Sequence, residues 1–273
     1  MEVTITASGR RLTLAGSVPE YLQPMSDWNA DSGVVAQVTK DLPRGALCLD
    51  IGANIGATAV PLAVQRADCR IVAFEPVPEN AEFLRANLRV NRIENVEVVE
   101  AAVSDVAGVL PLSNNGPYSM VAPGSNLHCR SVTLDEYVRE PVAFIKIDVE
   151  GYEPNVFAGA RRVFAEHRPL VLIEFNTWCM LVHGYNPVAF SAAIWSACDV
   201  LALYFMDQAL PAPGNPHELA HQNIVAHGSV TDVLLRPRTE LPGLDDMAYG
   251  PEVARLRREL TALREAQTVR QTR

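Results

Sequence analysis

Short apolar runs alternate with helix-length patterns along most of the chain. The runs of strand length are residues 47–51, 70–74, 96–99, 144–148, 170–175, 200–205 and 230–235. Patterns of helical length lie between most of them, at residues 54–66, 78–91, 153–167 and 187–197. Strands that are apolar throughout and are separated by helices are typical of a parallel sheet with both faces covered. The chain is therefore expected to adopt an α/β fold around a mainly parallel sheet.

Three segments fall outside this alternation. Residues 3–14 alternate around a central glycine, which predicts a hairpin, and a helix is expected near residues 30–40. Residues 101–141 contain two turn sequences and are expected to form a loop and a hairpin. From residue 251, apolar residues recur at a/d spacing for about two heptads, so we expect a short helix that docks, frays or pairs in a homodimer. We therefore divide the chain into a hairpin and helix that cover the site, a main domain and a helical tail, at residues 1–44, 45–250 and 251–273.

The composition is that of a globular protein of 273 residues. Apolar residues make up 48% and charged residues 20%, which excludes a disordered or low-complexity chain. The formal net charge is −9, and because clustered Lys and Arg hold a nucleic-acid backbone, this charge argues against a nucleic-acid partner. The five cysteines include no C-x-x-C pair, and the N-terminus shows no signal sequence. No apolar stretch reaches the roughly 18 residues of a membrane span, so we expect a cytoplasmic protein without a membrane partner.

A glycine-rich turn follows the first apolar run. Residues 50–56 read Asp-Ile-Gly-Ala-Asn-Ile-Gly, in which Gly52 and Gly56 allow a tight turn and a close approach of strand and helix. Such a turn directs the backbone amides of a helix N-terminus at a ligand. The next strand ends at Glu75, where an acidic side chain binds the hydroxyl groups of a ribose. The pattern predicts a nucleotide site.

Asp50 and Asn54 indicate which nucleotide is bound. A dinucleotide-binding turn carries glycine at the position of Asn54, so that a pyrophosphate can reach the backbone. Asp50 would also place a carboxylate close to the phosphates. A ligand with a ribose, no phosphate and a cationic end fits better, and S-adenosylmethionine has all three properties. A turn with a purely structural role is the alternative interpretation.

Ionisable residues gather at the end of a central strand. Residues 144–153 read Phe-Ile-Lys-Ile-Asp-Val-Glu-Gly-Tyr-Glu, and a period of two points Lys146, Asp148 and Glu150 in one direction. The carboxyl ends of parallel strands are where such sheets bind ligands. An ionic cluster inside an apolar sheet costs desolvation free energy, which favours a functional role over simple neutralisation of the two carboxylates by Lys146.

The chain resembles the FkbM family of S-adenosylmethionine-dependent methyltransferases. The similar stretches are residues 50–56, 74–80, 102–105, 133–135, 145–153 and 173–176, in family order. The resemblance implies a class I, Rossmann-like fold whose seven-stranded sheet has the order 3-2-1-4-5-7-6 and an antiparallel seventh strand. It also implies methyl transfer to a hydroxyl of a sugar or secondary metabolite, as in natural product biosynthesis. The cofactor-binding residues that it implies are Asp50, Gly52, Ala53, Asn54, Gly56, Glu75, Pro76, Ala102, Val103 and Asp148.

Methyl transfer to an alcohol requires the acceptor oxygen, the methyl group and the sulfur on one axis, and a base for the hydroxyl proton. Asp148 and Glu150 are the preferred candidates for that base. Lys146 is flanked by these carboxylates, so its pKa should be raised, which favours acceptor binding or charge balance. His183, after the fifth strand, is the other candidate, with simple packing as the alternative. The expected partner is a small-molecule or glycan acceptor, and no metal is assigned.

Two other sets of residues suggest metal chemistry. Some class I O-methyltransferases hold a divalent ion through carboxylates and an amide, and Asp148, Glu174 and Asn176 imitate that set, although the resemblance requires no metal. The stretch His217-Glu218-Leu219-Ala220-His221 matches the H-E-x-x-H of zinc peptidases, with His227 at the spacing of a third ligand. Upstream prolines and the missing turn glycine weigh against that match. A zinc metallopeptidase and a non-catalytic cofactor-binding module are the alternatives that the sequence leaves open.

Overall fold

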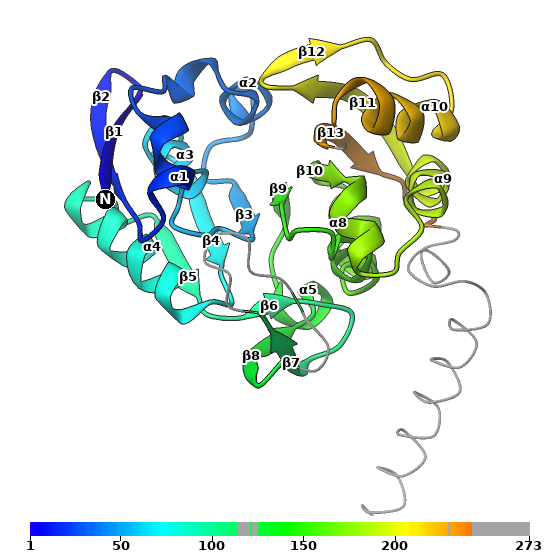
Figure 1. Ribbon diagram of the computed structural model, residues 1–273, viewed down its shortest axis with the longest axis horizontal. Coiled ribbons are helices and arrows are strands. Elements are labelled where there is room, and N and C mark those ends of the chain that lie inside the picture. The colour runs from blue at the N-terminus through cyan, green and yellow to red at the C-terminus, as the bar shows by residue number, and fades with distance from the viewer. Residues whose placement is uncertain (114–120, 122–124, 229, 242–273) are drawn as a thin grey trace, which may run out of the picture.

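An eight-stranded sheet forms the centre of the computed structural model, which describes residues 1–113, 121, 125–228 and 230–241 (Figure 1). The strands of this sheet are β3 (Leu47–Ile51), β4 (Arg70–Phe74), β5 (Val96–Val99), β9 (Val142–Ile147), β10 (Leu170–Asn176), β11 (Cys198–Phe205), β12 (Gln208–Leu210) and β13 (Val230–Pro237). Their spatial order is β12-β11-β13-β10-β9-β3-β4-β5. Strand β13 runs antiparallel to both of its neighbours, whereas β5, β4, β3, β9 and β10 pair in parallel.

This arrangement confirms the expected class I methyltransferase fold. Counted in chain order without β12, the sheet reads 3-2-1-4-5-7-6, and its seventh strand is the antiparallel one. The difference from the expected seven strands is β12, which pairs antiparallel with β11 through three residues and adds an eighth strand at the edge. Asp207, between them, has a positive φ of 63°, so the chain reverses there without glycine.

Smaller sheets and helices surround the central sheet. The smaller strands are β1 (Glu2–Ala7) and β2 (Arg10–Ala15), and β6 (Ala102–Val103), β7 (Gly108–Leu112) and β8 (Leu127–Val132). The α-helices are α1 (Pro19–Leu22), α2 (Val34–Thr39), α3 (Ala59–Gln65), α4 (Pro78–Val90), α5 (Leu134–Tyr137), α6 (Glu153–Ala158), α7 (Arg161–His167), α8 (Thr177–Val182), α9 (Pro187–Ala197) and α10 (Pro216–His221). Short 3-10 turns η1 (Gln23–Met25) and η2 (Ala30–Ser32) and a π-helical turn η4 (Gln222–Ala226) complete the elements.

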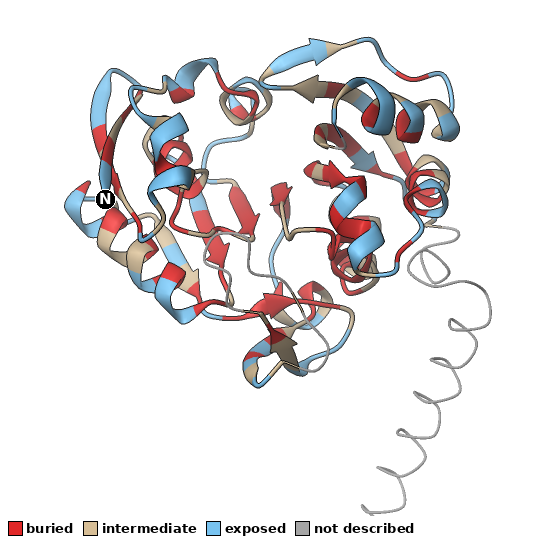
Figure 2. Ribbon diagram, in the orientation of Figure 1, coloured by how far each residue is buried: buried red, intermediate tan, exposed pale blue. Residues whose placement is uncertain are grey.

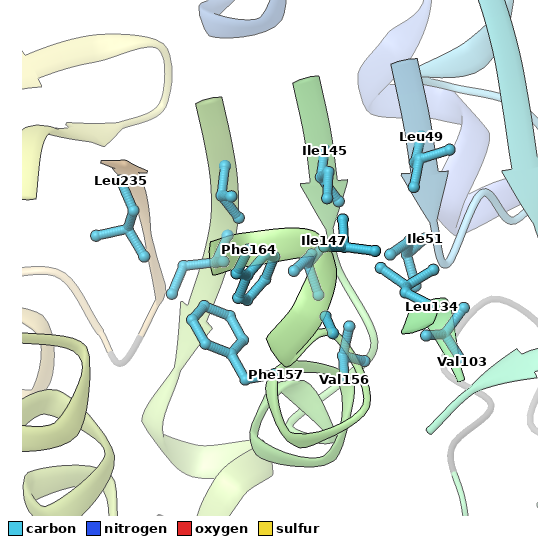
Figure 3. Close-up of a cluster of buried hydrophobic side chains, with 14 of the residues drawn as sticks. Leu49, Ile51, Val103, Leu134, Ile145, Ile147, Val156, Phe157, Phe164 and Leu235 are labelled. Atoms are coloured by element: carbon cyan, nitrogen blue, oxygen red, sulfur yellow. The ribbon is translucent and has the colours of Figure 1, made fainter. Parts of the chain in front are cut away.

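The largest apolar core lies on one face of the sheet. Figure 3 shows Leu49 and Ile51 of β3 and Ile145 and Ile147 of β9 directed toward helices α6 and α7. The aromatic rings there pack edge to face, with Phe157 and Phe164 having centroids 4.9 Å apart. Because side chains alternate along a strand, the intervening residues point to the other face. Buried residues accordingly concentrate on the central strands (Figure 2).

The opposite face is covered by α2 and α3, and the β1–β2 hairpin extends this layer over α4 (Figure 1). Two buried asparagines one turn apart on α4 hold the hairpin. Asn87 exchanges hydrogen bonds with the backbone of Ala15, at 2.8 and 3.0 Å, and Asn91 does so with Thr13, at 2.9 and 2.7 Å. The amide side chains thereby pair with the free backbone edge of β2, which fixes the N-terminal segment to the sheet domain.

Two expected helices are shorter than the sequence pattern indicates. The helix expected at residues 54–66 begins only at Ala59, because Asn54 and Gly56 have positive φ angles of 50° and 97°, outside the helical region. The helix expected at residues 153–167 is divided into α6 and α7 around Gly159. The backbone is bent there because it lies against Ser104, whose oxygen would be 1.9 Å from a Cβ at Gly159.

Other expectations are met where the structure describes them. Strands β1 and β2 form the hairpin expected at residues 3–14, and β7 and β8 form the one expected within residues 101–141. The five cysteines are free and buried. Across the described ranges, every helix is too short or too polar to cross a bilayer. The tail helix expected at residues 251–273 lies outside the described residues, and the division into three parts stays a prediction.

Candidate active site

The loop between β3 and α3 is wound against the end of β9. Gly52 has a φ of 85°, and a Cβ at this position would lie 1.8 Å from the backbone oxygen of Asp148. Gly56 has a φ of 97°, and its Cβ would lie 2.6 Å from Cδ1 of Leu84 on α4. Both the conformation and the close approach therefore require glycine, as the sequence pattern predicts. The amides of Gly52 and Ala53 donate to the carbonyl of Phe74, at 3.0 and 2.9 Å, and tie the loop to β4.

Glu75, at the end of β4, joins this loop to α4. Its Oε2 accepts a hydrogen bond of 2.8 Å from the amide of Asn54, and its Oε1 accepts one of 2.9 Å from the amide of Val77. Burial raises the pKa of Glu75 to about 7, although these hydrogen bonds act in the opposite direction. The carboxyl group is thus held rigidly at the place where the sequence predicts contact with a ribose.

A cavity of about 310 Å³ opens beside these residues. Seven of the ten predicted cofactor-binding residues line it, namely Gly52, Asn54, Glu75, Pro76, Ala102, Val103 and Asp148. The other three predicted residues do not line the cavity. Ala53 and Gly56 shape the loop, and Asp50 is buried under it on β3.

Asp50 provides the test of whether the site suits S-adenosylmethionine. Its Oδ2 atom is buried and has no hydrogen-bond partner among the residues that the structure describes. Burial raises the pKa of Asp50 to about 7, against the opposing influence of Lys146. An unpartnered carboxylate oxygen beneath the glycine loop fits a ligand with a cationic amino end, and Glu75 fits its ribose. The residues present therefore suit this cofactor.

The loop after β9 distributes its charged side chains differently from the sequence expectation. Strand β9 ends at Ile147, and Glu150 has a φ of 53°, followed by Gly151 at 90°, so the period of two does not continue. Glu150 therefore lines the 310 Å³ cavity, Lys146 lines an adjoining cavity of about 190 Å³, and Asp148 lines both. The three groups lie close together but do not share one direction.

Lys146 is a charged residue inside the sheet. Its Nζ lies 3.5 Å from Oδ2 of Asp148 and 3.3 Å from Oδ1 of Asp232 on β13. Burial opposes the charge, but the carboxylates of Asp148 and Asp232 outweigh it, so the pKa of Lys146 is raised. A lysine with a raised pKa cannot accept a proton near neutral pH, in agreement with the sequence argument.

His183 lies on the outer side of the same loop. Its Nε2 is 3.0 Å from the backbone oxygen of Glu150, and its ring packs near Tyr152 and Tyr185. Burial lowers the pKa of His183. The residue is not among those that line either cavity. In this position it supports the loop, and its predicted role as a base stays a prediction.

Several further residues of the site were not predicted from the sequence to bind the cofactor or to act as the base. Tyr21 of α1 and Tyr152 line the larger cavity, and Glu174 of β10 lines both cavities. Glu153 is fully buried, and its Oε1 accepts hydrogen bonds from the amides of Val149 and Gly151, at 3.2 and 3.3 Å. The sequence signal that could have identified Glu153 is its position three residues after Glu150, from which a carboxylate can accept hydrogen bonds from the backbone amides of the loop.

Several of the residues proposed for metal chemistry have other partners. Oδ1 of Asn176 caps α8 by accepting from the amide of Cys179 at 3.1 Å. Glu218 accepts from the amide of Gly214 at 2.6 Å, and the ring of His227 packs against Phe205 at a tilt, with centroids 4.8 Å apart. Within the described ranges, no group of three or more His, Cys, Asp or Glu side chains is arranged to hold a metal ion. The zinc-peptidase alternative based on His217-Glu218-x-x-His221 is therefore not supported.

Comparison with known proteins finds similarity to methyltransferases. A family model described as the methyltransferase FkbM domain matches residues 50–181. Ribosomal RNA small subunit methyltransferase G of Streptomyces coelicolor is 30% identical over 99 residues, which are 36% of this chain and 41% of that protein. Methyltransferase sdnD of Sordaria araneosa is 34% identical over 74 residues, which are 27% of this chain and 29% of that protein. The chain thus spans less than half the length of these relatives.

A crystal structure of methyltransferase FkbM from Methylobacillus flagellatus aligns with 70% of this chain and 43% of that chain, at 18% identity and a TM-score of 0.43. The family match is the informative comparison, because residues 50–181 include both the glycine loop and the charged loop after β9. It confirms the resemblance and the expectation of S-adenosylmethionine as cofactor. Residues 50–181 match the methyltransferase FkbM domain of S-adenosylmethionine-dependent methyltransferases.

Proposed function

We propose that this chain transfers a methyl group from S-adenosylmethionine to a hydroxyl group of a sugar or secondary metabolite. The match of residues 50–181 to the methyltransferase FkbM domain supports S-adenosylmethionine as the methyl donor. The observation that supports the proposed transfer to a hydroxyl group is the position of Asp148. It lines both the 310 Å³ cavity, which we call the cofactor cavity, and the adjoining 190 Å³ cavity. A carboxylate where two cavities meet is placed between a bound cofactor and an acceptor in the second cavity, where it can take a hydroxyl proton.

The chemistry divides between the cofactor and the chain. S-adenosylmethionine supplies a methyl group on a sulfonium, whose carbon–sulfur bond breaks as the carbon–oxygen bond to the acceptor forms, releasing S-adenosylhomocysteine. Asp148 accepts the proton that the hydroxyl loses, and its side chain is 37% exposed, so solvent can remove that proton afterwards. Lys146 stays charged 3.5 Å away and holds the orientation of the Asp148 carboxylate. Tyr21 lies over the larger cavity and helps to exclude water from it.

Methylation of RNA is the second candidate, because the name of the Streptomyces relative states a ribosomal RNA substrate. Charge weighs against it in this chain, whose formal net charge is −9. Four carboxylates, those of Asp148, Glu174, Asp207 and Asp232, line the cavity next to the cofactor site. A polyanion would be repelled there, so we favour a small-molecule or glycan acceptor without nucleic acid.

The free, buried state of all five cysteines supports a reducing, cytoplasmic location as part of this proposal. A homodimer formed through residues 251–273 is likewise a proposal, which sedimentation of the full chain against a chain ending at residue 250 would test.

The test is calorimetric titration with S-adenosylhomocysteine, with and without a chelator, followed by transfer of a tritiated methyl group to a panel of acceptors. We expect saturable binding at micromolar strength that the chelator does not change, and label in a hydroxyl-bearing small molecule. Absence of binding would overturn the assignment of the cofactor cavity. Label found only in ribosomal RNA would overturn the proposed acceptor class and establish the second candidate.

A further inference from the structure

The 190 Å³ cavity adjoins the cofactor cavity and shares the residues Asp148 and Glu174 with it. It lies on the sheet face that α2 and α3 cover, where Lys146 of β9, Glu174 of β10 and Asp232 of β13 come from adjacent strands. If the proposed function holds, the acceptor must reach the methyl group from a space next to the cofactor. In the described part of the structure, the 190 Å³ cavity lies next to the cofactor cavity and can hold such an acceptor.

The cavity has an excess of negative charge that the protein itself does not neutralise. Lys146 is the one basic residue among its described lining, and it pairs with both Asp148 and Asp232. Within the described part of the chain Asp207 has no basic partner, and its Oδ1 accepts a hydrogen bond of 2.8 Å from the amide of Val34, the first residue of α2. The remaining carboxylate, that of Glu174, has no hydrogen bond or ion pair within the described part of the chain.

Glu174 lies close to other carboxylates, so a cation bound beside it would interact with several negative charges. It is directly opposite Asp232 in the antiparallel pairing of β10 with β13. The neighbouring carboxylate of Asp148, together with burial, raises the pKa of Glu174 well above its ordinary value, in spite of Lys146. Asp148 just after β9, Glu174 on β10 and Asp232 on β13 therefore bring three carboxylates to this cavity, whose one basic residue in the described lining is Lys146. A second cation in the cavity would relieve this repulsion.

An aromatic side chain on the opposite wall points to the kind of cation. Trp28 is half-buried and lines the cavity, and its Cζ2 atom would be 3.1 Å from a Cβ at Gly33. The indole is thus fixed against the backbone of Gly33, while Val34 and Pro61 supply apolar surface. Organic ammonium groups are bound by an aromatic face together with carboxylates, whereas a bare metal ion would gain nothing from the indole and the aliphatic side chains.

We propose that the 190 Å³ cavity binds the methyl acceptor and that this acceptor carries a protonated amine, as an amino sugar does. This inference rests on the proposed function and specifies its substrate. The amine is held by Glu174 and Asp207 against Trp28, and the hydroxyl to be methylated faces Asp148 at the junction with the cofactor cavity. The cavity is smaller than the roughly 300–1,000 Å³ of sites for drug-sized ligands, which suits one sugar ring of a larger acceptor.

The test compares D-glucosamine with N-acetyl-D-glucosamine, which has the same ring but no charge, by titration into the protein saturated with S-adenosylhomocysteine. We expect the amine to bind at least about tenfold more tightly, the scale of one charge-assisted contact. Asp207→Asn retains the acceptor for the Val34 amide and removes the charge, and it should abolish most of that preference. Glu82→Gln, an exposed change of the same kind on α4, is the matched control and should leave the preference intact.

Each other outcome has a distinct meaning. Equal binding of the two sugars, or an Asp207→Asn protein with unchanged preference, would overturn the amine inference while leaving the methyltransferase proposal in place. Weaker binding of S-adenosylhomocysteine by Asp207→Asn would assign the cavity to the cofactor and would likewise overturn the inference. Failure of the unmodified protein to bind S-adenosylhomocysteine at all would instead count against the proposed function.

Discussion

Oε2 of Glu75 lies 2.8 Å from the amide nitrogen of Asn54, so the end of β4 and the glycine loop after β3 form one hydrogen-bonded wall of the cofactor cavity. The contact links two stretches that are 21 residues apart in sequence. The glycine loop contributes backbone amides to this wall, and Glu75 contributes a carboxylate. Their hydrogen bond fixes the distance between the two parts of the site that we predict to hold the methionine and ribose portions of the cofactor.

Replacement of Glu75 should therefore weaken cofactor binding in two ways. Glu75→Ala removes the predicted ribose contact and leaves the Asn54 amide without its partner, so we expect the Kd for S-adenosylhomocysteine to rise by about tenfold or more. Calorimetric titration measures this directly. Glu79→Ala removes an exposed carboxylate from the first turn of α4 and serves as the control. Equal affinities of the Glu75→Ala and Glu79→Ala proteins would refute the assignment.

The affinity for the cofactor should also depend on pH with a definite sign. Burial raises the pKa values of Asp50 and Glu75 to about 7 each, so both groups are mainly protonated at pH 6 and mainly ionised at pH 8. Ionised Asp50 attracts the ammonium end of the ligand and ionised Glu75 accepts more strongly from the ribose hydroxyl groups, so binding of S-adenosylhomocysteine should strengthen as the pH rises through 7. Titrations at pH 6, 7 and 8 check the trend, and Asp50→Asn should reduce it. An affinity that falls with rising pH would contradict this account.

Much of this site could be predicted from the sequence, because the glycine requirement and the strand-end acids are local properties. Gly52, Glu75 and the sheet order follow from spacing and from the family resemblance. The sequence suggested Glu174 only as a metal ligand and did not suggest Asp207, since the two reach the second cavity through the pairing of β10, β13 and β11. The direction of Glu150 was also unpredictable from periodicity, because the strand ends at Ile147 and the next turn is left-handed.

Two glycines with similar backbone angles separate the effect of close packing from that of conformation. Gly52 and Gly45 have φ angles of 85° and 74°, but a Cβ at Gly52 meets the Asp148 oxygen at 1.8 Å and a Cβ at Gly45 meets nothing within 4 Å. Gly45→Ala should lower the free energy of unfolding by about 1 kcal/mol, from backbone strain alone. Gly52→Ala should lower it by roughly 3 kcal/mol or more. Urea unfolding of the two proteins measures the difference, and equal losses would show that the contact with Asp148 is unimportant.

Asp148→Asn tests the proposed base. Asparagine keeps the size and one oxygen acceptor but cannot take a proton, so kcat should fall by about 100-fold, within the usual range for loss of a general base. The Kd for S-adenosylhomocysteine should change much less, because the wall of the cavity is retained. Single-turnover methyl transfer and calorimetry on the same preparation provide the two values. Equal losses in rate and affinity would assign Asp148 to cofactor binding instead.

Glu153 should make the stability of the protein depend on pH. Its pKa is raised to about 8 because the side chain is fully buried, even though Oε1 accepts the amides of Val149 and Gly151. The folded state therefore holds a proton that the unfolded chain releases near its ordinary value of 4.5. The resulting stability is fully present below pH 4.5 and is lost as the pH rises toward 8, by an amount on the order of 5 kcal/mol.

Glu153→Gln separates this effect from those of the other buried carboxyl groups. Glutamine retains an oxygen for the two amides and cannot ionise, so the decline in unfolding free energy between pH 5 and pH 9 should be smaller than in the unmodified protein. Urea unfolding at several pH values gives the slopes, with exposed Glu82→Gln as the control. Parallel slopes for all three proteins would mean that Glu153 ionises equally in the folded and unfolded states. A smaller slope for Glu153→Gln alone would show that the loop carrying Asp148 and Glu150 is held by a protonated carboxyl group beneath it.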